Sequence, residues 1–324
     1  MKLLVTGGAG YIGAVVAAKL LAAGHQVTVL DDLSTGHADA VPAGAVFVHG
    51  TVRDDAKQVL GDGDIDAVLH FAAHSLVGES VANPAKYWSN NLGGTLALIE
   101  EMHRAGTRKI VFSSTAAVYG DPERVPITES DPTRPTSPYG ASKLAVDTAL
   151  TEYSRVHGIG GVSLRYFNVA GAYRCADGSW LGERHRPETH LIPNVLGQGG
   201  DHLSVRINGT DYPTPDGTCV RDYIHVSDLA DAHLLALGAC EPGGHRIYNL
   251  GNGAGFSVRE VIDVCREVTG REILAETGPR RAGDPAVLVA SSARIQAELG
   301  WEAARDLRDM VADAWQFVQV RAAR

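Results

Sequence analysis

The stretch TGGAGYIG (residues 6–13) begins at the last residue of the apolar run KLLVT and leads into a segment with apolar residues at helical spacing. A strand, a glycine-rich turn and a helix in this order are typical of a dinucleotide-binding unit. Gly7, Gly10 and Gly13 permit the tight turn, the approach of backbone N–H groups to a pyrophosphate and close packing of helix on strand. The N-terminus of the helix adds roughly half a positive charge. We therefore expect a dinucleotide phosphate here, with a plain turn as the alternative.

The second apolar run, QVTVL, is followed by Asp31 and Asp32, about 20 residues beyond the glycines. A carboxylate at this place accepts hydrogen bonds from the ribose hydroxyls of adenosine and repels a 2′-phosphate. The following residues DLSTGH contain no arginine that could receive such a phosphate. The pattern favours NAD over NADP as the cofactor. The structural alternative is that the two aspartates cap or solvate a loop.

The first half of the chain alternates strand-like runs with segments of helical spacing, which predicts a Rossmann-type, doubly wound parallel sheet. The runs are so apolar that we expect helices on both faces of the sheet. The expected strands are KLLVT (2–6), QVTVL (26–30), AVFVHG (45–50), AVLHFAA (67–73), KIVFSS (109–114) and GVSLRYF (161–167), with RIYNLG (246–251) rejoining the sheet.

A change of texture after residue 171 predicts a second domain. Residues 172–224 are rich in Gly, Pro, Asp, Arg and His, and residues 257–270 and 307–320 have the spacing of amphipathic helices. We expect an NAD-binding domain at 1–171, with a returning segment near 225–252, and a smaller C-terminal α/β domain for the substrate at 172–324. The length of 324 residues agrees with about two domains.

Composition and charge exclude several classes of function. The formal net charge of -9, without a long basic stripe, disfavours binding to nucleic acid or to an anionic membrane surface. The sequence contains no run of about 18 apolar residues, so we expect no membrane-spanning helix. The four cysteines are widely spaced, which suits reduced thiols in a cytoplasm and gives no metal site. His70 and His74 are expected at a strand end, where their spacing does not predict a metal site either.

The segment SPYGASK (137–143) places Tyr139 and Lys143 four residues apart on one face of an expected helix, roughly 6 Å apart at Cβ. A cation at that distance, at an effective dielectric constant of about 20, contributes roughly 2.8 kcal/mol, or about two pKa units. A free phenol has a pKa near 10, so the charge of oxidised nicotinamide is needed as well, and burial opposes both. Tyr139 is thus predicted as a proton acceptor. Thr115, at the end of an expected strand, can relay a proton through its hydroxyl, although turn chemistry would also explain it.

Taken together, TGGAGYIG, NNLGGT (90–95), SSTAAVYG (113–120) and YGASK (139–143) resemble the extended short-chain dehydrogenase/reductase superfamily. RYFNVAGA (165–172), the stretch 211–233 and RRAGDPA (280–286) narrow the resemblance to its UDP-glucose 4-epimerase family, nearly end to end. The resemblance implies interconversion of UDP-glucose and UDP-galactose through a 4-keto sugar, with NAD unchanged overall. It also implies a homodimer that pairs through residues 88–105 and 138–157.

The resemblance implies roles for individual residues. Tyr139 would be the general base and acid, Lys143 its electrostatic partner and a ligand of the nicotinamide ribose, and Thr115 the hydroxyl relay. The cofactor contacts would be Gly7, Gly10, Tyr11, Ile12, Gly13, Asp31, Asp32, Thr51, Val52, Phe71, Ala72, Ala73, Asn91, Ser113, Tyr139, Lys143 and Tyr166. The UDP-sugar contacts would be Thr115, Tyr139, Asn168, His190, Leu191, Arg221, Arg281 and Asp284. His190 stands where relatives of this kind frequently carry asparagine.

Other activities of the same superfamily remain as alternatives. A dehydratase needs an acid and a base after the threonine, whereas Ala116 and Ala117 follow Thr115 here. A net NAD(P)-dependent reductase is disfavoured by Asp31, and a noncatalytic binding protein has no use for Thr115, Tyr139 and Lys143 together. Leu288, where some relatives carry tyrosine, leaves room for an N-acetyl group, so UDP-GlcNAc/UDP-GalNAc or UDP-glucuronate epimerisation is the closest alternative.

Overall fold

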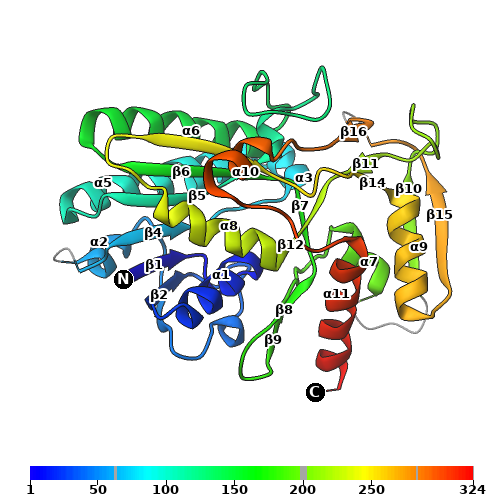
Figure 1. Ribbon diagram of the computed structural model, residues 1–324, viewed down its shortest axis with the longest axis horizontal. Helices are drawn as coiled ribbons and strands as arrows, with labels where there is room; N and C mark the ends of the chain where they lie inside the picture. The colour runs from blue at the N-terminus through cyan, green and yellow to red at the C-terminus, as the bar shows by residue number, and fades with distance from the viewer. Residues whose placement is uncertain (62–63, 198–202, 282–283, 324) are drawn as a thin grey trace.

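The computed structural model describes residues 1–61, 64–197, 203–281 and 284–323 and contains a seven-stranded parallel sheet (Figure 1). The strands lie in the order β13-β6-β5-β4-β1-β2-β3, and every neighbouring pair is parallel. Their bounds are β1 (Lys2–Thr6), β2 (Gln26–Asp31), β3 (Val46–His49), β4 (Ala67–His70), β5 (Lys109–Thr115), β6 (Gly160–Tyr166) and β13 (His245–Leu250). The predicted doubly wound sheet is confirmed, including the return of the segment near residue 246.

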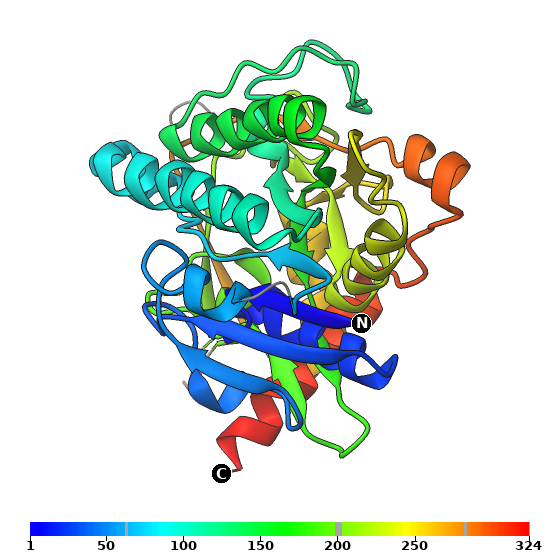
Figure 2. The same ribbon diagram turned by 90° about the vertical axis from the view of Figure 1, so that its left-hand side faces the viewer.

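Helices cover both faces of this sheet because successive side chains of its strands point to opposite sides. Leu3 and Val5 pack with α1 (Tyr11–Ala22) and α8 (Val226–Gly238), whereas Leu4 packs with the helices of the other face. The remaining helices of this part are α2 (Ala56–Leu60), α3 (Val77–Ala82), α4 (Pro84–Tyr87), α5 (Thr95–Ala105) and α6 (Pro138–His157), with short helical turns η1 (Ala38–Ala40), η2 (Trp88–Gly94) and η3 (Ala116–Val118). Figure 2 shows α5 and α6 side by side over one face.

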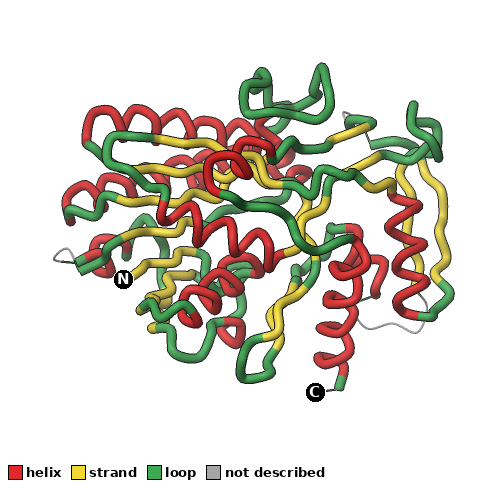
Figure 3. Tube along the Cα trace, in the orientation of Figure 1, coloured by secondary structure: helices red, strands yellow, loops and turns green. Residues whose placement is uncertain are grey.

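The C-terminal part consists of short strands, loops and helices around a core of its own (Figure 3). Its small sheets are β10-β15, β14-β11-β16, β12-β7 and β8-β9. Its elements are β7 (Asn168–Ala170), β8 (Ala172–Arg174), β9 (Trp180–Gly182), α7 (Leu191–Leu196), β10 (Leu203–Asn208), β11 (Val220–Arg221), β12 (Tyr223–His225), β14 (Phe256–Ser257), α9 (Val258–Thr269), β15 (Ile273–Gly278), β16 (Val287–Leu288), α10 (Ala293–Leu299) and α11 (Leu307–Ala322).

The two predicted C-terminal helices are confirmed as α9 and α11, and each begins at a residue that caps it. Ser257 and Glu260 form a capping box at α9, and Asp306 and Asp309 form one at α11. Gly270, in the left-handed conformation, ends α9. The division of the chain into two domains at residue 171 stays a prediction. Within the described ranges, no helix is both long and apolar enough to cross a membrane.

Candidate active site

A cavity of about 770 Å³ lies between the carboxyl ends of the parallel strands and the C-terminal part. Parallel strands end at one edge of their sheet, so Gly7, Asp31, Phe71 and Thr115, each at or just after a strand end, meet there. Nearly all predicted site residues line this cavity. They are Gly7, Gly10, Tyr11, Ile12, Gly13, Asp31, Asp32, Thr51, Val52, Phe71, Ala72, Ala73, Ser113, Thr115, Tyr139, Lys143, Tyr166, Asn168, His190, Leu191, Arg221, Arg281 and Asp284.

The glycine turn between β1 and α1 is shaped for close approach of its backbone. Gly7 has φ +71, and a Cβ there would lie 2.6 Å from the backbone nitrogen of Ala72. A Cβ at Gly13 would overlap the carbonyl oxygen of Gly7. Gly10 caps α1 without a side-chain hydrogen bond, so the first N–H groups of the helix are left for a ligand. This arrangement fits the pyrophosphate of NAD.

Asp31 holds the same turn from the end of β2. One carboxylate oxygen accepts a hydrogen bond from the backbone N–H of Ala9 at 3.0 Å, and the other accepts one from Leu33 at 2.8 Å. Burial raises the pKa of Asp31, and these two hydrogen bonds oppose that change. Each oxygen keeps lone pairs for the ribose hydroxyls that the sequence predicts there. Asp32 is exposed and accepts a hydrogen bond from the backbone N–H of Ser34.

β4 ends three residues earlier than predicted, at His70. The chain leaves the sheet here because the turn at Gly7 packs against Ala72, and residues 71–73 line the cavity instead of extending the strand. The His70 ring is fully enclosed between the hydroxyls of Thr6 and Thr95, at 2.6 and 2.8 Å. Burial lowers the pKa of His70 to about 3, so the ring is neutral and supports the sheet edge.

The predicted reactive group is Tyr139, near the N-terminus of α6, together with Thr115 from the end of β5. Burial raises the pKa of Tyr139, and a hydrogen bond with Thr115 opposes this change. The expected acidification of the phenol is therefore absent from the protein alone. The positive charge of oxidised nicotinamide, which the sequence argument already required, has to overcome the effect of burial.

Lys143 lies one helical turn beyond Tyr139 and is 3% exposed. Its Nζ donates a hydrogen bond to the carbonyl oxygen of Ser113 at 2.8 Å and lies 4.8 Å from the centroid of the Phe112 ring. Burial lowers the pKa of Lys143 to about 7, with Asp147 opposing the shift. Near neutral pH this lysine is therefore poised between its two charge states, unlike a surface lysine.

Asn91 is the one predicted cofactor contact that does not line the cavity. Its side-chain oxygen accepts a hydrogen bond from the backbone N–H of His74, and its amide donates to the carbonyl of His74 and to Ser142. Ser142 in turn donates to the carbonyl oxygen of Tyr139. Asn91 thus ties the loop after β4 to the first turns of α6, and its contact with NAD stays a prediction.

The far end of the cavity carries the predicted arginines. The guanidinium of Arg221 on β11 donates to the carboxylate of Asp284 at 2.5 Å and to the carbonyl of Val220 at 2.7 Å. Arg281 and Asp284 belong to the motif RRAGDPA, in which Ala282 and Gly283 lie outside the described residues. Guanidinium groups at this end suit the diphosphate of a nucleotide sugar.

Several cavity residues were not foreseen from the sequence. Ser204, Arg206 and Asn208 line the cavity from β10, while Val205 and Ile207 between them are buried in the C-terminal core. The alternation of polar and apolar residues in SVRIN is the signal that could have predicted this strand. Glu183 and His185 also line the cavity beside His190.

Comparison with known proteins agrees with this geometry. The sequence pattern of the "NAD dependent epimerase/dehydratase family" matches residues 3–251. The UDP-glucose 4-epimerase of Corynebacterium glutamicum is 55% identical over 319 residues, with 98% of this chain and 95% of the relative covered. The protein of that name from Streptomyces lividans is 56% identical over 322 residues, with the same shares covered.

A solved structure supports the same relationship. The UDP-glucose 4-epimerase of Bifidobacterium longum in complex with NAD+ and UDP is 37% identical to this chain, with a TM-score of 0.91 and 99% of each chain covered. A family pattern that spans well over half of the chain, and relatives above 50% identity over nearly all of it, leave one assignment. The chain belongs to the NAD dependent epimerase/dehydratase family.

Proposed function

We propose that this protein interconverts UDP-glucose and UDP-galactose by epimerisation at C4 of the sugar, with NAD as its resident cofactor. The observation that carries the proposal is the meeting of the glycine turn, the Thr115–Tyr139–Lys143 group and Arg221 in one cavity. The similarity to UDP-glucose 4-epimerases, which extends over almost the whole length of both relatives, supports it.

The residues of this chain supply the proton chemistry of the reaction. NAD, when bound, supplies a hydride acceptor and donor, so that C4 can be oxidised and then reduced. Tyr139 accepts the proton of the C4 hydroxyl at its phenolic oxygen and later returns it. Thr115, hydrogen-bonded to Tyr139, relays this proton and orients the sugar. Lys143 holds the carbonyl group of Ser113, near the end of β5, through its hydrogen bond.

The arginines that would bind the diphosphate explain how the sugar can rotate without leaving the cavity. Arg221 and Arg281 anchor the UDP group, while the sugar itself reaches the cavity between Thr115 and Tyr139. If most binding energy comes from UDP, the oxidised sugar can present its other face while it stays tethered. The cavity of about 770 Å³ lies in the upper part of the usual size range of ligand sites, which suits a site shared by a cofactor and a sugar.

A wider choice of sugar is the second candidate function. Leu288 on β16 is half-buried and lines the cavity, where a larger side chain would reduce the space beside the substrate. We therefore propose that the protein also interconverts UDP-GlcNAc and UDP-GalNAc, which can be assayed as a second substrate pair. Equal exclusion of both N-acetylated sugars would contradict this extension and leave the first proposal intact.

The assembly and the compartment are part of the proposal. We infer a homodimer that pairs through helices of residues 88–105 and 138–157, where Trp88 is 41% and Val156 is 60% exposed. The four cysteines are unpaired, which suits a reducing cytoplasm. Light scattering on the purified protein would test the dimer, and a monomer at micromolar concentration would contradict it.

The decisive experiment uses purified protein and UDP-galactose with no cofactor added. We expect UDP-glucose to form, and NAD to be released only when the protein is denatured. A reductase would instead need added NADH or NADPH in proportion to its product. Product that appears only with added NADPH, or a sugar that loses water, would contradict the proposal.

A further inference from the structure

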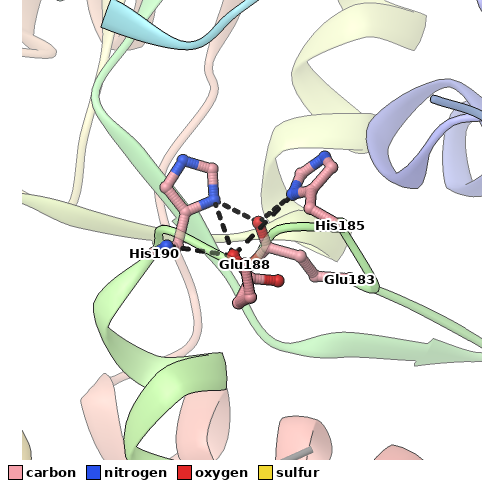
Figure 4. Close-up of side chains that lie close together, drawn as sticks. All are labelled: Glu183, His185, Glu188 and His190. Carbon is pink, nitrogen blue, oxygen red and sulfur yellow. Dashed lines mark hydrogen bonds and ion pairs between the residues drawn. The ribbon is translucent and has the colours of Figure 1, made fainter. Parts of the chain in front are cut away.

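The loop between β9 and α7 gathers two histidines and two glutamates close together (Figure 4). Three of them, Glu183, His185 and His190, line the cavity. Glu183 directly follows β9, and His190 is the N-cap residue of α7. His185 and Glu188 lie between them, so the sequence has the pattern E-x-H-x-x-E-x-H. None of the proton-transfer residues belongs to this cluster.

The potential ligand atoms converge on one point. One potential ligand atom from each side chain lies within 4.8 Å of the other three. Nδ1 of His185 is 3.0 Å from Oε1 of Glu183 and 3.9 Å from Oε1 of Glu188, and Nδ1 of His190 is 3.8 Å from the latter. Ligands about 2.0–2.2 Å from a shared ion lie roughly 3–4 Å from one another. These separations suit one ion, provided that Nδ1 of His190 and Oε1 of Glu183, which contact each other directly, move apart to admit it.

The hydrogen bonds among these groups leave one nitrogen of the cluster unsatisfied. Within the described part of the chain, Nδ1 of His185 is shielded from solvent and makes no hydrogen bond, although Oε1 of Glu183 lies so close. Nδ1 of His190 contacts the same carboxylate oxygen even more closely. Both imidazole nitrogens can donate to this one oxygen only if each carries a proton. A cation between the three atoms would instead accept the lone pairs of both nitrogens.

The loop is held in this shape from the sheet side. The guanidinium of Arg184 pairs with the carboxylate of Asp39, and the carbonyl of Arg184 lies 3.1 Å from Nε2 of His37. Glu188 accepts hydrogen bonds from the backbone N–H groups of residues 189 and 190, which fixes its carboxylate. Such outer contacts orient metal ligands in proteins.

We propose that Glu183, His185 and His190, with Glu188 as a further oxygen ligand, bind one divalent transition-metal ion of the zinc type. Two imidazoles with carboxylates favour such an ion over calcium or magnesium, which prefer oxygen ligands alone. The charge of the ion balances the two carboxylates when both imidazoles are neutral. The bound ion fixes the loop that forms this wall of the cavity.

The test uses the full-length holoprotein, washed with a chelator and titrated with Co2+ alone. We expect one equivalent of Co2+ to produce the visible absorption of a low-coordinate site with imidazole ligands. His185→Ala and Glu183→Gln should each weaken binding by more than the roughly 10–100-fold that is typical for loss of an outer contact. His103→Ala is the matched control, because it removes a half-buried histidine of α5 that contacts another histidine ring outside the cluster.

A second measurement does not depend on the folding of any variant. Crystals of the wild-type protein soaked in Zn2+ should give an anomalous peak between the side chains of Glu183, His185 and His190. The proposal fails if the peak is absent or lies elsewhere. It also fails if Co2+ binding persists in folded His185→Ala protein or is lost in His103→Ala. In either case the cluster serves only to fasten the loop through ion pairs.

Discussion

The two ends of the cavity are built from different kinds of structure. Tyr139 and Lys143 lie on α6, a helix of 20 residues, beside the buried strand β5. Arg221 lies on a strand of two residues, paired with the equally short β16 and β14. Long elements fix the reacting groups in position, whereas short strands and loops carry the groups that hold the ligand.

The charges at the two ends also differ in their partners. Lys143 is buried, and its Nζ donates to the neutral carbonyl of Ser113, so its charged form is poorly compensated. Arg221 pairs with the carboxylate of Asp284. We therefore expect the end with Tyr139 and Lys143 to depend on the charge of the cofactor, and the end with Arg221 to exchange its pair with Asp284 for contacts with a diphosphate. A perturbed pKa such as that of Lys143 is typical of a catalytic site.

Tyr139→Phe tests the reactive end and should have the largest effect. The variant keeps the ring and its packing but loses the proton acceptor. We expect kcat to fall about 10²–10⁴-fold while the affinity for UDP stays nearly unchanged. Steady-state assays with UDP-galactose and calorimetry with UDP would measure the two quantities.

Tyr153→Phe is the matched control on the same helix. Its hydroxyl bonds to Glu100 rather than to a cavity residue, so kcat should stay near the wild-type value. Similar losses of kcat in both variants would mean that α6 responds to any lost hydroxyl. Near-normal turnover by Tyr139→Phe would remove this residue from the mechanism.

Arg221→Met tests the binding end. Hydrogen bonds to charged groups contribute about 1.5–3 kcal/mol, and the variant also leaves the Asp284 carboxylate free to repel a diphosphate. We expect the KM for UDP-galactose to rise roughly 10–100-fold with kcat changed only a few-fold. A fall in kcat without a change in KM would contradict the assignment of this end to binding.

Arg280→Met provides the comparison for that variant. Arg280 pairs with Asp211 and lies over the ring of Tyr212, and it is not among the residues that line the cavity. Its loss should leave KM within about twofold of the wild-type value, because exposed ion pairs contribute little. Arg221→Lys, which keeps the charge but not the fork of donors, should fall between the two.

The same contrast decides what the sequence could predict. β1, β2 and the turn at Gly7 form a local pattern, because strand, glycines and helix follow one another within a few residues. α6 and its capping residue Ser137 are equally local. Neighbours in the sequence determine these elements, and the parallel sheet and its carboxyl edge follow from their order.

Positions that depend on contacts between distant segments were less accessible. The hydrogen bonds of Asn91 to His74 and Ser142 join segments that are far apart in the sequence, and its contact with the cofactor stays a prediction from resemblance. The effect of burial on Tyr139 depends on packing that spacing cannot reveal. Arg206 lines the cavity because it lies on β10, whose partner strand β15 is far along the chain. In each case tertiary packing, and not the local pattern, sets the role.

Asp31→Asn tests whether the glycine turn belongs to the reactive end or stands apart from it. The amide keeps the shape of the side chain, but its nitrogen cannot accept a hydrogen bond from Ala9 or Leu33. We expect roughly tenfold weaker retention of NAD. NAD content after gel filtration measures this, and Asp263→Asn, which replaces an exposed aspartate outside the cavity, should retain the wild-type content. Equal losses in both variants would contradict a specific role for Asp31.

Lys143→Met should produce the smallest effect among these variants, a change in the free energy of unfolding whose sign follows from the pKa of the lysine. Burial, opposed by Asp147, lowers the pKa of Lys143 from 10.5 to about 7 in the folded protein. Between these two values the unfolded chain binds more protons, so the free energy of unfolding of the wild type rises with pH in this window. The penalty for the buried charge is present in full below pH 7. The variant should therefore be more stable than the NAD-free wild type near pH 6, by roughly 1 kcal/mol.

That advantage should shrink as pH approaches 10, where the folded wild type has lost the buried charge. Urea unfolding of NAD-free protein at both pH values isolates the ionisation, because changes in packing contribute equally at each. Lys57→Met, which replaces an exposed lysine, should differ from the wild type by the same small amount throughout. A stability difference for Lys143→Met that does not depend on pH would mean that the lysine is no more strained than its counterpart at the surface. The contrast between the two ends of the cavity would then rest on geometry alone.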